Sequence, residues 1–153
     1  MSWWTAVAER TLSQDVPAAP GEVRDFYVDL DNVGLVHPLI FSVEALSRNQ
    51  TSDGYSQSYR VKDRIPLGPL TIRITYRARL HVPTRGDVLT EADQSPGVRL
   101  RGTVSFEPVP GGTRVTERIR ISAPRPLAAV TAREAVKAHV AMLAAIRRHF
   151  ERA

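Results

Sequence analysis

A histidine in the middle of an apolar helical stripe is the residue whose type and position most clearly suggest chemistry in this chain. The stripe's six residues are spaced by four, three, four, three and four, which places them on one face of a helix. A titratable imidazole among buried apolar side chains usually has a partner or a role, so His139 is the first candidate functional residue. The stripe comprises Ala132, Val136, His139, Leu143, Ile146 and Phe150.

Further polar residues share the inward-facing parity of a long run of alternating sequence between Tyr55 and Ala123. A core that serves only stability rarely turns so many polar side chains inward. An apolar pocket with a few convergent polar groups is typical of a small-molecule site. Asp63 has the same parity, but it lies beside a turn at a strand end, so we expect it in solvent. The other members are Tyr55, Gln57, Tyr59, Tyr76 and Glu117.

Glu117 and His139 allow three interpretations. If the two side chains meet, the carboxylate orients the imidazole and raises its basicity. Such a pair could transfer a proton to or from an enolisable polyketide, or it could simply satisfy two buried polar groups. Contact with a ligand without chemistry is the interpretation we favour. The ligand-orienting residues would be Tyr55, Gln57, Tyr59, Tyr76, Glu117 and His139, with Ile74 and Leu143 as apolar wall.

Several other kinds of site are not indicated. The chain has no cysteine, which excludes disulfides and thiolate metal sites. The remaining histidines are weaker candidates: His37 precedes a proline in a loop, His81 has the outward parity, and His149 falls in the last helical turn. No two histidines have the spacing of a metal site, and neither a glycine-rich phosphate loop nor a Gly-x-Ser-x-Gly motif occurs. The sequence therefore predicts no metal and no cofactor.

The alternation and its interruptions predict the elements that carry these residues. A first strand spans Trp4 to Val16, and Pro17–Gly21 stops it. A short helix begins at Pro20 with an apolar face ending at Leu30, and a second runs from Asp31 to Val36. A closing helix of roughly 26 residues, about 39 Å long, follows Pro124-Arg125-Pro126 and reaches Arg152. Between them, strands are expected around 41–45, 55–64, 70–82, 87–93, 98–107 and 115–121, and the facing of 87–93 is left open.

Short connections between these strands favour antiparallel hairpins. One face of the resulting sheet is rich in arginine and solvated, whereas the other must be covered. The terminal helix is long enough to cover it. The predicted fold is therefore α+β, a single domain over residues 1–153 with a seven-stranded, strongly curved antiparallel sheet around the C-terminal helix and a hollow between them.

Composition restricts the partners and the location. The net charge is +5, and 19 of the 21 basic residues are arginine, spread over many strands rather than clustered. This distribution is typical of a solvated face and speaks against a nucleic-acid surface. No apolar run approaches the roughly 18 residues of a membrane span, and the first residues lack the pattern of a secretory signal. We therefore expect a cytoplasmic protein without a transmembrane segment.

Three stretches at element boundaries carry a family resemblance. They are Val16–Val23 before and within the first helix, His37-Pro38 after the second helix, and Gly111–Thr116 at the start of the last strand. With the order of elements, they make the whole chain resemble the helix-grip fold of the START/Bet v 1-like (SRPBCC) superfamily. The closer resemblance is to its bacterial polyketide cyclase/dehydrase and lipid-transport-like branch. The resemblance implies a cavity for lipids, sterols, polyketides or other hydrophobic molecules. It brings no catalytic motif that can be carried over residue by residue.

The leading hypothesis is a carrier that binds a small hydrophobic molecule between the sheet and the last helix. The alternative is an enzyme of the aromatase/cyclase type that uses His139 or Glu117 for proton transfer. A third hypothesis is an interaction module whose arginine-rich outer strands bind an acidic partner or nucleic acid.

Overall fold

The computed structural model describes residues 4–94 and 97–152, and in these ranges all strands join one antiparallel sheet. The sheet order is β1-β7-β6-β5-β4-β3-β2, so that β1 and β2 are its edges. The predicted helix-grip α+β fold is confirmed. Its elements are β1 (Thr5–Val16), α1 (Pro20–Val28), α2 (Leu30–Val36), β2 (Ile40–Thr51), β3 (Gly54–Leu67), β4 (Leu70–Pro83), β5 (Val88–Gln94), β6 (Val98–Val109), β7 (Gly112–Pro124) and α3 (Arg125–Glu151).

The two-residue alternation of the sequence decides which face of each strand is buried. In β7, Val115, Ile119 and Ile121 are buried, whereas Arg118 and Arg120 between them are exposed. Successive side chains of a strand point to opposite faces, so this pattern gives the sheet one apolar and one solvated side. The inward parity predicted from the sequence is confirmed along β3, β4, β6 and β7.

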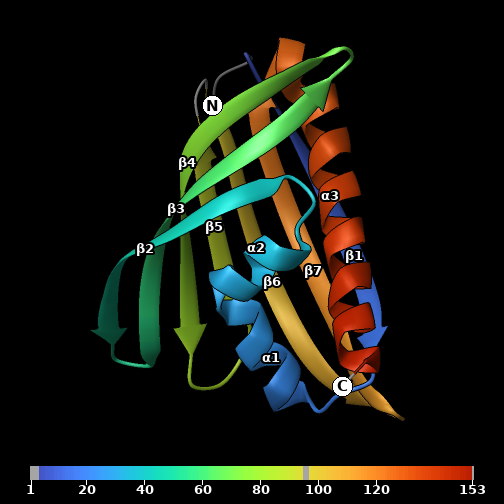
Figure 1. Ribbon diagram of the computed structural model, residues 1–153. Helices are drawn as coiled ribbons and strands as arrows, with labels where there is room; N and C mark the ends of the chain where they lie inside the picture. Colours follow the sequence, from blue (N-terminus) through green and yellow to red (C-terminus); the bar gives the residue numbers. More distant parts are fainter. Residues whose placement is uncertain (1–3, 95–96, 153) are drawn as a thin grey trace.

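The sheet curves around α3, which packs mainly on β1 and β7 (Figure 1). The short helices α1 and α2 lie on the same side of the sheet, at the end where α3 terminates. The ring of Phe26 in α1 lies 4.4 Å from the His149 ring and 5.5 Å from the Phe150 ring in the last turns of α3. These contacts close one end of the space between sheet and helix.

The boundaries at two turns differ from the prediction. The segment 49–54 was expected to be a loop, but β2 continues to Thr51 and β3 begins at Gly54. Backbone pairing, which needs no apolar side chains, extends this hairpin through polar residues. Gly54 is required there, because a Cβ would lie 2.1 Å from the carbonyl oxygen of Val82. The second short helix begins at Leu30 rather than Asp31, since the Asp29 side chain caps it by accepting the N–H of Asp31 at 3.0 Å.

Two further details concern α3 and β5. The helix starts at Arg125, one residue before Pro126. A proline is tolerated in the first helical turn, because the N–H that it lacks would have no partner within the helix. The facing of β5, which the sequence left open, is now defined. Val88 is buried, and Thr90 and Ala92 turn toward the concave side.

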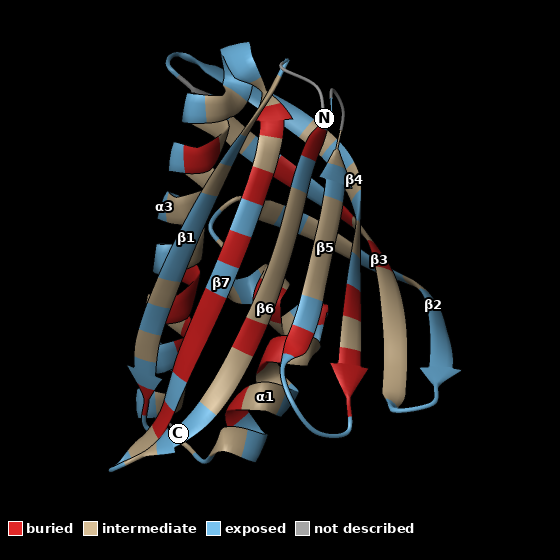
Figure 2. Cartoon of the chain, turned by 180° about the vertical axis from the view of Figure 1, so that it is seen from behind, coloured by how far each residue is buried: buried red, intermediate tan, exposed pale blue. Residues whose placement is uncertain are grey.

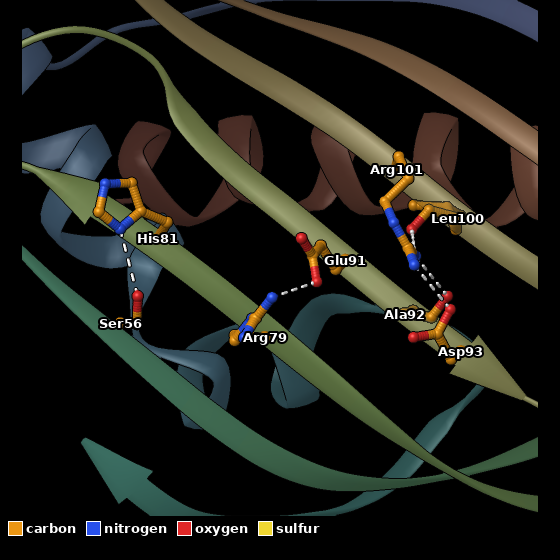
Figure 3. A network of polar contacts seen from close by, with 8 residues as sticks. All are labelled: Ser56, Arg79, His81, Glu91, Ala92, Asp93, Leu100 and Arg101. Atoms are coloured by element: carbon orange, nitrogen blue, oxygen red, sulfur yellow. Dashed lines mark hydrogen bonds and ion pairs between the residues drawn. The ribbon is translucent and has the colours of Figure 1, made fainter. Parts of the chain in front are cut away.

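The convex side of the sheet carries the exposed side chains of the alternation, such as Arg118 and Arg120 in β7, and Figure 2 shows exposed residues interspersed with buried ones along the strands. Figure 3 shows its cross-strand contacts: Arg79 pairs with Glu91 at 2.8 Å, and Arg101 pairs with Asp93 at 3.0 Å. His81 approaches the hydroxyl of Ser56 at 3.2 Å on the same side. Such exposed ion pairs add little stability, so this face mainly provides solubility.

Within the part of the chain that the structure describes, no helix combines the length and apolar character needed to cross a lipid bilayer.

Candidate functional site

A cavity of about 340 Å³ lies between the concave side of the sheet and the N-terminal half of α3. Most of its wall is aliphatic, with contributions from β3 to β7 and from all three helices. Two apolar side chains at its rim are substantially exposed, Ile72 at 42% and Leu127 at 37%. They lie near the β3–β4 hairpin and in the first turn of α3, at the end of the sheet opposite to α1.

Of the eight residues predicted to contact a ligand, some line the cavity and others lie outside its wall. Ile74, Tyr76 and His139 line the cavity. Glu117 and Leu143 are buried immediately behind it and do not belong to its wall.

The three remaining residues, all on β3, lie outside the cavity wall. Tyr59 is buried, and its hydroxyl donates to the carbonyl of Val28 at 3.4 Å. Gln57 donates to the carbonyl of Ser47 at 3.0 Å. The ring of Tyr55 lies 3.7 Å beneath the guanidinium of Arg48. These contacts fix the packing of β3 against β2 and α1.

Glu117 is the centre of a buried hydrogen-bonded triad. Its carboxylate is only 1% exposed and accepts a hydrogen bond from the hydroxyl of Tyr27 in α1. Its other oxygen lies 3.0 Å from Nδ1 of His139. An ionised carboxylate only accepts, so the imidazole donates from Nδ1 and keeps Nε2 for the cavity. Tyr27 itself lines the cavity, although the sequence indicated it only as part of an apolar helix face.

The charge of Glu117 determines the protonation of its neighbours. Burial lowers the pKa of His139, but the charge and hydrogen bond of the adjacent Glu117 carboxylate, together with the charge of Asp63, outweigh this effect, and the pKa of His139 is raised above its usual value. Burial, together with the same carboxylate, raises the pKa of the Tyr27 hydroxyl well above its ordinary value. Tyr27 therefore remains a hydrogen-bond donor, and His139 holds a proton more readily than an ordinary histidine does.

His37 belongs to the site, although the sequence analysis considered it a weaker candidate. It lies in the cavity wall, with its ring 5.6 Å from the ring of His139 in an edge-to-face arrangement. Its Nδ1 accepts the backbone N–H of Leu39 at 3.2 Å, which leaves a proton on Nε2. Burial and the nearby charge of His139 lower the pKa of His37 to about 3, so this imidazole stays neutral. The sequence signal that could have identified His37 is its position before Pro38, because a proline holds the preceding residue in an extended conformation.

The prediction that the Asp63 side chain lies in solvent is wrong. The side chain was expected in solvent, but Asp63 is 6% exposed and faces the cavity. Its parity on β3 points inward, and the hairpin continues to Leu67, so the residue lies within the curved sheet instead of at its end. The hydroxyl of Tyr76 on β4 donates to both carboxylate oxygens, at 3.2 and 3.3 Å. Burial raises the pKa of Asp63 to about 6, although the Tyr76 hydrogen bond acts in the opposite direction.

The cavity therefore combines an apolar wall with two polar pairs, His37 with His139 and Asp63 with Tyr76. One imidazole is neutral and the other takes a proton readily, which is the condition for acid–base chemistry. Among the described residues, no three histidine or carboxylate side chains converge as metal ligands would.

Comparison with known proteins places the chain in a family. A sequence model described as polyketide cyclase/dehydrase and lipid transport matches residues 7–151. No curated protein matches in sequence.

Solved structures share the fold at low identity. A Thermus thermophilus protein, TTHA0849, superposes with a TM-score of 0.73 at 16% identity, covering 92% of this chain and 95% of that one. The Zhui aromatase/cyclase from Streptomyces sp. R1128 gives 0.70 at 17% identity, with 97% and 94% covered. A STAR-related lipid transfer protein fragment from Xanthomonas axonopodis gives 0.59 at 17% identity, with 99% and 96% covered. These likenesses show a shared fold, and the sequence match over residues 7–151 shows that the chain belongs to the polyketide cyclase/dehydrase and lipid-transport family.

Proposed function

We propose that the protein binds a small hydrophobic molecule, such as a lipid or a polyketide, in the cavity between the sheet and α3. The observation that carries this proposal is the cavity of about 340 Å³, which is within the range of small-molecule sites and is bordered mostly by aliphatic side chains. Protein interiors are normally close-packed, because an unfilled apolar cavity loses packing contacts and lowers stability. A cavity of this size in a small domain therefore favours a role in binding. Membership of a family described by lipid transport supports the same function.

Native mass spectrometry tests this proposal directly. Protein purified gently from its own host is expected to carry a lipophilic molecule that adds a discrete mass and is released on unfolding. A naphthalene-based fluorescent probe should bind the emptied protein with about 1:1 stoichiometry. Repeated recovery of empty protein, together with no saturable probe binding, would contradict the proposal.

A second candidate function is proton transfer to a bound polyketide, in the manner suggested by the aromatase/cyclase likeness. The specific observation in its favour is the 3.0 Å contact of Glu117 with Nδ1 of His139, a residue that lines the cavity. In this candidate, His139 would give a proton to a carbonyl oxygen, and Glu117 would orient the imidazole from behind.

Turnover of a poly-β-ketone separates the two functions. If the protein is an enzyme, His139→Ala abolishes cyclisation and retains most of the ligand affinity. If it is a carrier, the wild-type protein leaves the poly-β-ketone unchanged beyond the uncatalysed rate. A variant that loses binding and turnover equally would remove the case for a catalytic His139.

A further inference from the structure

Asp63 is a buried carboxylate whose hydrogen-bonding capacity the fold does not fill. An ionised carboxylate has about four acceptor positions. In residues 4–94 and 97–152, the hydroxyl of Tyr76 is the donor that reaches it, shared between the two oxygens at 3.2 and 3.3 Å. The remaining acceptor positions face the cavity, because Asp63 is part of its wall.

The charge of Asp63 is also not matched by a partner in direct contact. The charge of His139 on α3 acts on Asp63 through space, but neither His139 nor His37 forms an ion pair with Asp63 in the described chain. His139 is already hydrogen-bonded to Glu117, and His37 is neutral. A buried, underpaired carboxylate costs stability, and an asparagine or leucine would avoid that cost. Its presence in the cavity wall points to a ligand that supplies a donor.

We propose that Asp63, held in place by Tyr76, binds a hydroxyl group of the ligand, so that the cavity selects hydroxylated hydrophobic molecules. This inference rests on the proposed ligand-binding function and specifies its substrate class. A hydroxyl group donating to a carboxylate forms a short, charge-assisted hydrogen bond.

Two probes of nearly equal shape test the inference. They are 2-naphthol, which donates a hydrogen bond, and 2-methoxynaphthalene, in which the same oxygen is capped. Isothermal titration calorimetry at pH 7.5 gives both dissociation constants for the wild type and for Asp63→Asn. We expect the substitution to weaken 2-naphthol binding by about tenfold, because the amide oxygen of asparagine still accepts from the hydroxyl but the hydrogen bond is no longer charge-assisted. The affinity for 2-methoxynaphthalene should change by less than about twofold.

Asp93→Asn is the matched control, because Asp93 lies on the outer face and pairs with Arg101. It should bind both probes as the wild type does. Equal losses for both probes in Asp63→Asn, or an unchanged affinity for 2-naphthol, would overturn the assignment of Asp63. Failure of both probes to bind the wild type would instead contradict the proposed ligand-binding function itself. Thermal unfolding of each variant verifies that it is folded at the titration temperature.

Discussion

Nδ1 of His139 lies 3.0 Å from Oε1 of Glu117, joining the middle of α3 to the centre of β7. Tyr27 of α1 binds the other oxygen of the same carboxylate. The triad thus ties α1, β7 and α3 together beside the cavity.

Removal of the central carboxylate is expected to destabilise the fold. Glu117→Leu leaves the Tyr27 hydroxyl and the His139 imidazole without their shared acceptor, so the free energy of unfolding should fall by about 3 kcal/mol or more. A double-mutant cycle with His139→Gln, measured by urea denaturation, should give a coupling energy of about 1–3 kcal/mol.

The exposed pair of Arg60 with Glu44 serves as the control for that cycle, since its side chains are 42% and 60% exposed. A cycle on this pair should yield less than about 1 kcal/mol. Strict additivity at Glu117 and His139 would show that their contact is energetically irrelevant.

The protonation of His139 should depend on Glu117. Its pKa is raised in the folded protein, so the stabilisation from its protonated form is complete below pH 6.5 and disappears as pH rises through the folded pKa. NMR titration of the imidazole should give a value above 6.5 in the wild type and a lower value in Glu117→Gln. A His139 pKa that stays the same in this variant would mean that the carboxylate is not what raises it.

Asp63 should reduce stability at neutral and alkaline pH. Its pKa is about 6 when folded and near 3.8 when unfolded, so the wild type loses stability as pH rises through this window. The loss amounts to about 3 kcal/mol by the size of the shift. Asp63→Asn lacks this loss, and its unfolding free energy relative to the wild type should be higher at pH 8 than at pH 4. Parallel pH profiles of the two proteins would refute the prediction.

His37 should make the protein labile in acid. Its pKa falls from 6.5 to about 3 on folding, so the stability that it contributes is complete above pH 6.5 and declines as pH drops toward 3. His37→Asn keeps an acceptor for the N–H of Leu39 but does not titrate. Chemical denaturation between pH 4 and pH 7 should therefore show a flatter acid dependence in the variant. An unchanged slope would place the acid sensitivity elsewhere.

Filling the cavity should abolish ligand binding without unfolding the protein. Ala78 on β4 turns into the cavity, and a phenylalanine there would occupy space that a ligand needs. Probe affinity should drop by about tenfold or more in Ala78→Phe, since the lost apolar contact area is that of a whole ring. Ala45→Phe, on an exposed position of β2, is the matched control and should bind normally. Normal binding by Ala78→Phe would mean that the probe sits outside this cavity.

The sequence alone was sufficient for the sheet and its orientation. Two-residue alternation fixes which side chains of a strand share a face, and proline and glycine interrupt it at the turns. The 3–4 spacing of the α3 stripe likewise placed His139 on the buried face. Glu117 has inward parity on β7 and was correctly identified as a possible partner of His139, because the apolar face of α3 and the inward face of the sheet must pack together.

The tertiary structure alone decided which inward residues reach the cavity. Parity gives the face of a strand but not the depth along it, and depth depends on how the sheet curves and where α1 and α2 fill its concave side. For this reason Tyr55 and Gln57 pack outside the cavity, whereas Asp63 on the same strand lines it. The meeting of His37 with His139 joins residues about a hundred positions apart, and such contacts arise from the packing of whole elements rather than from any local pattern.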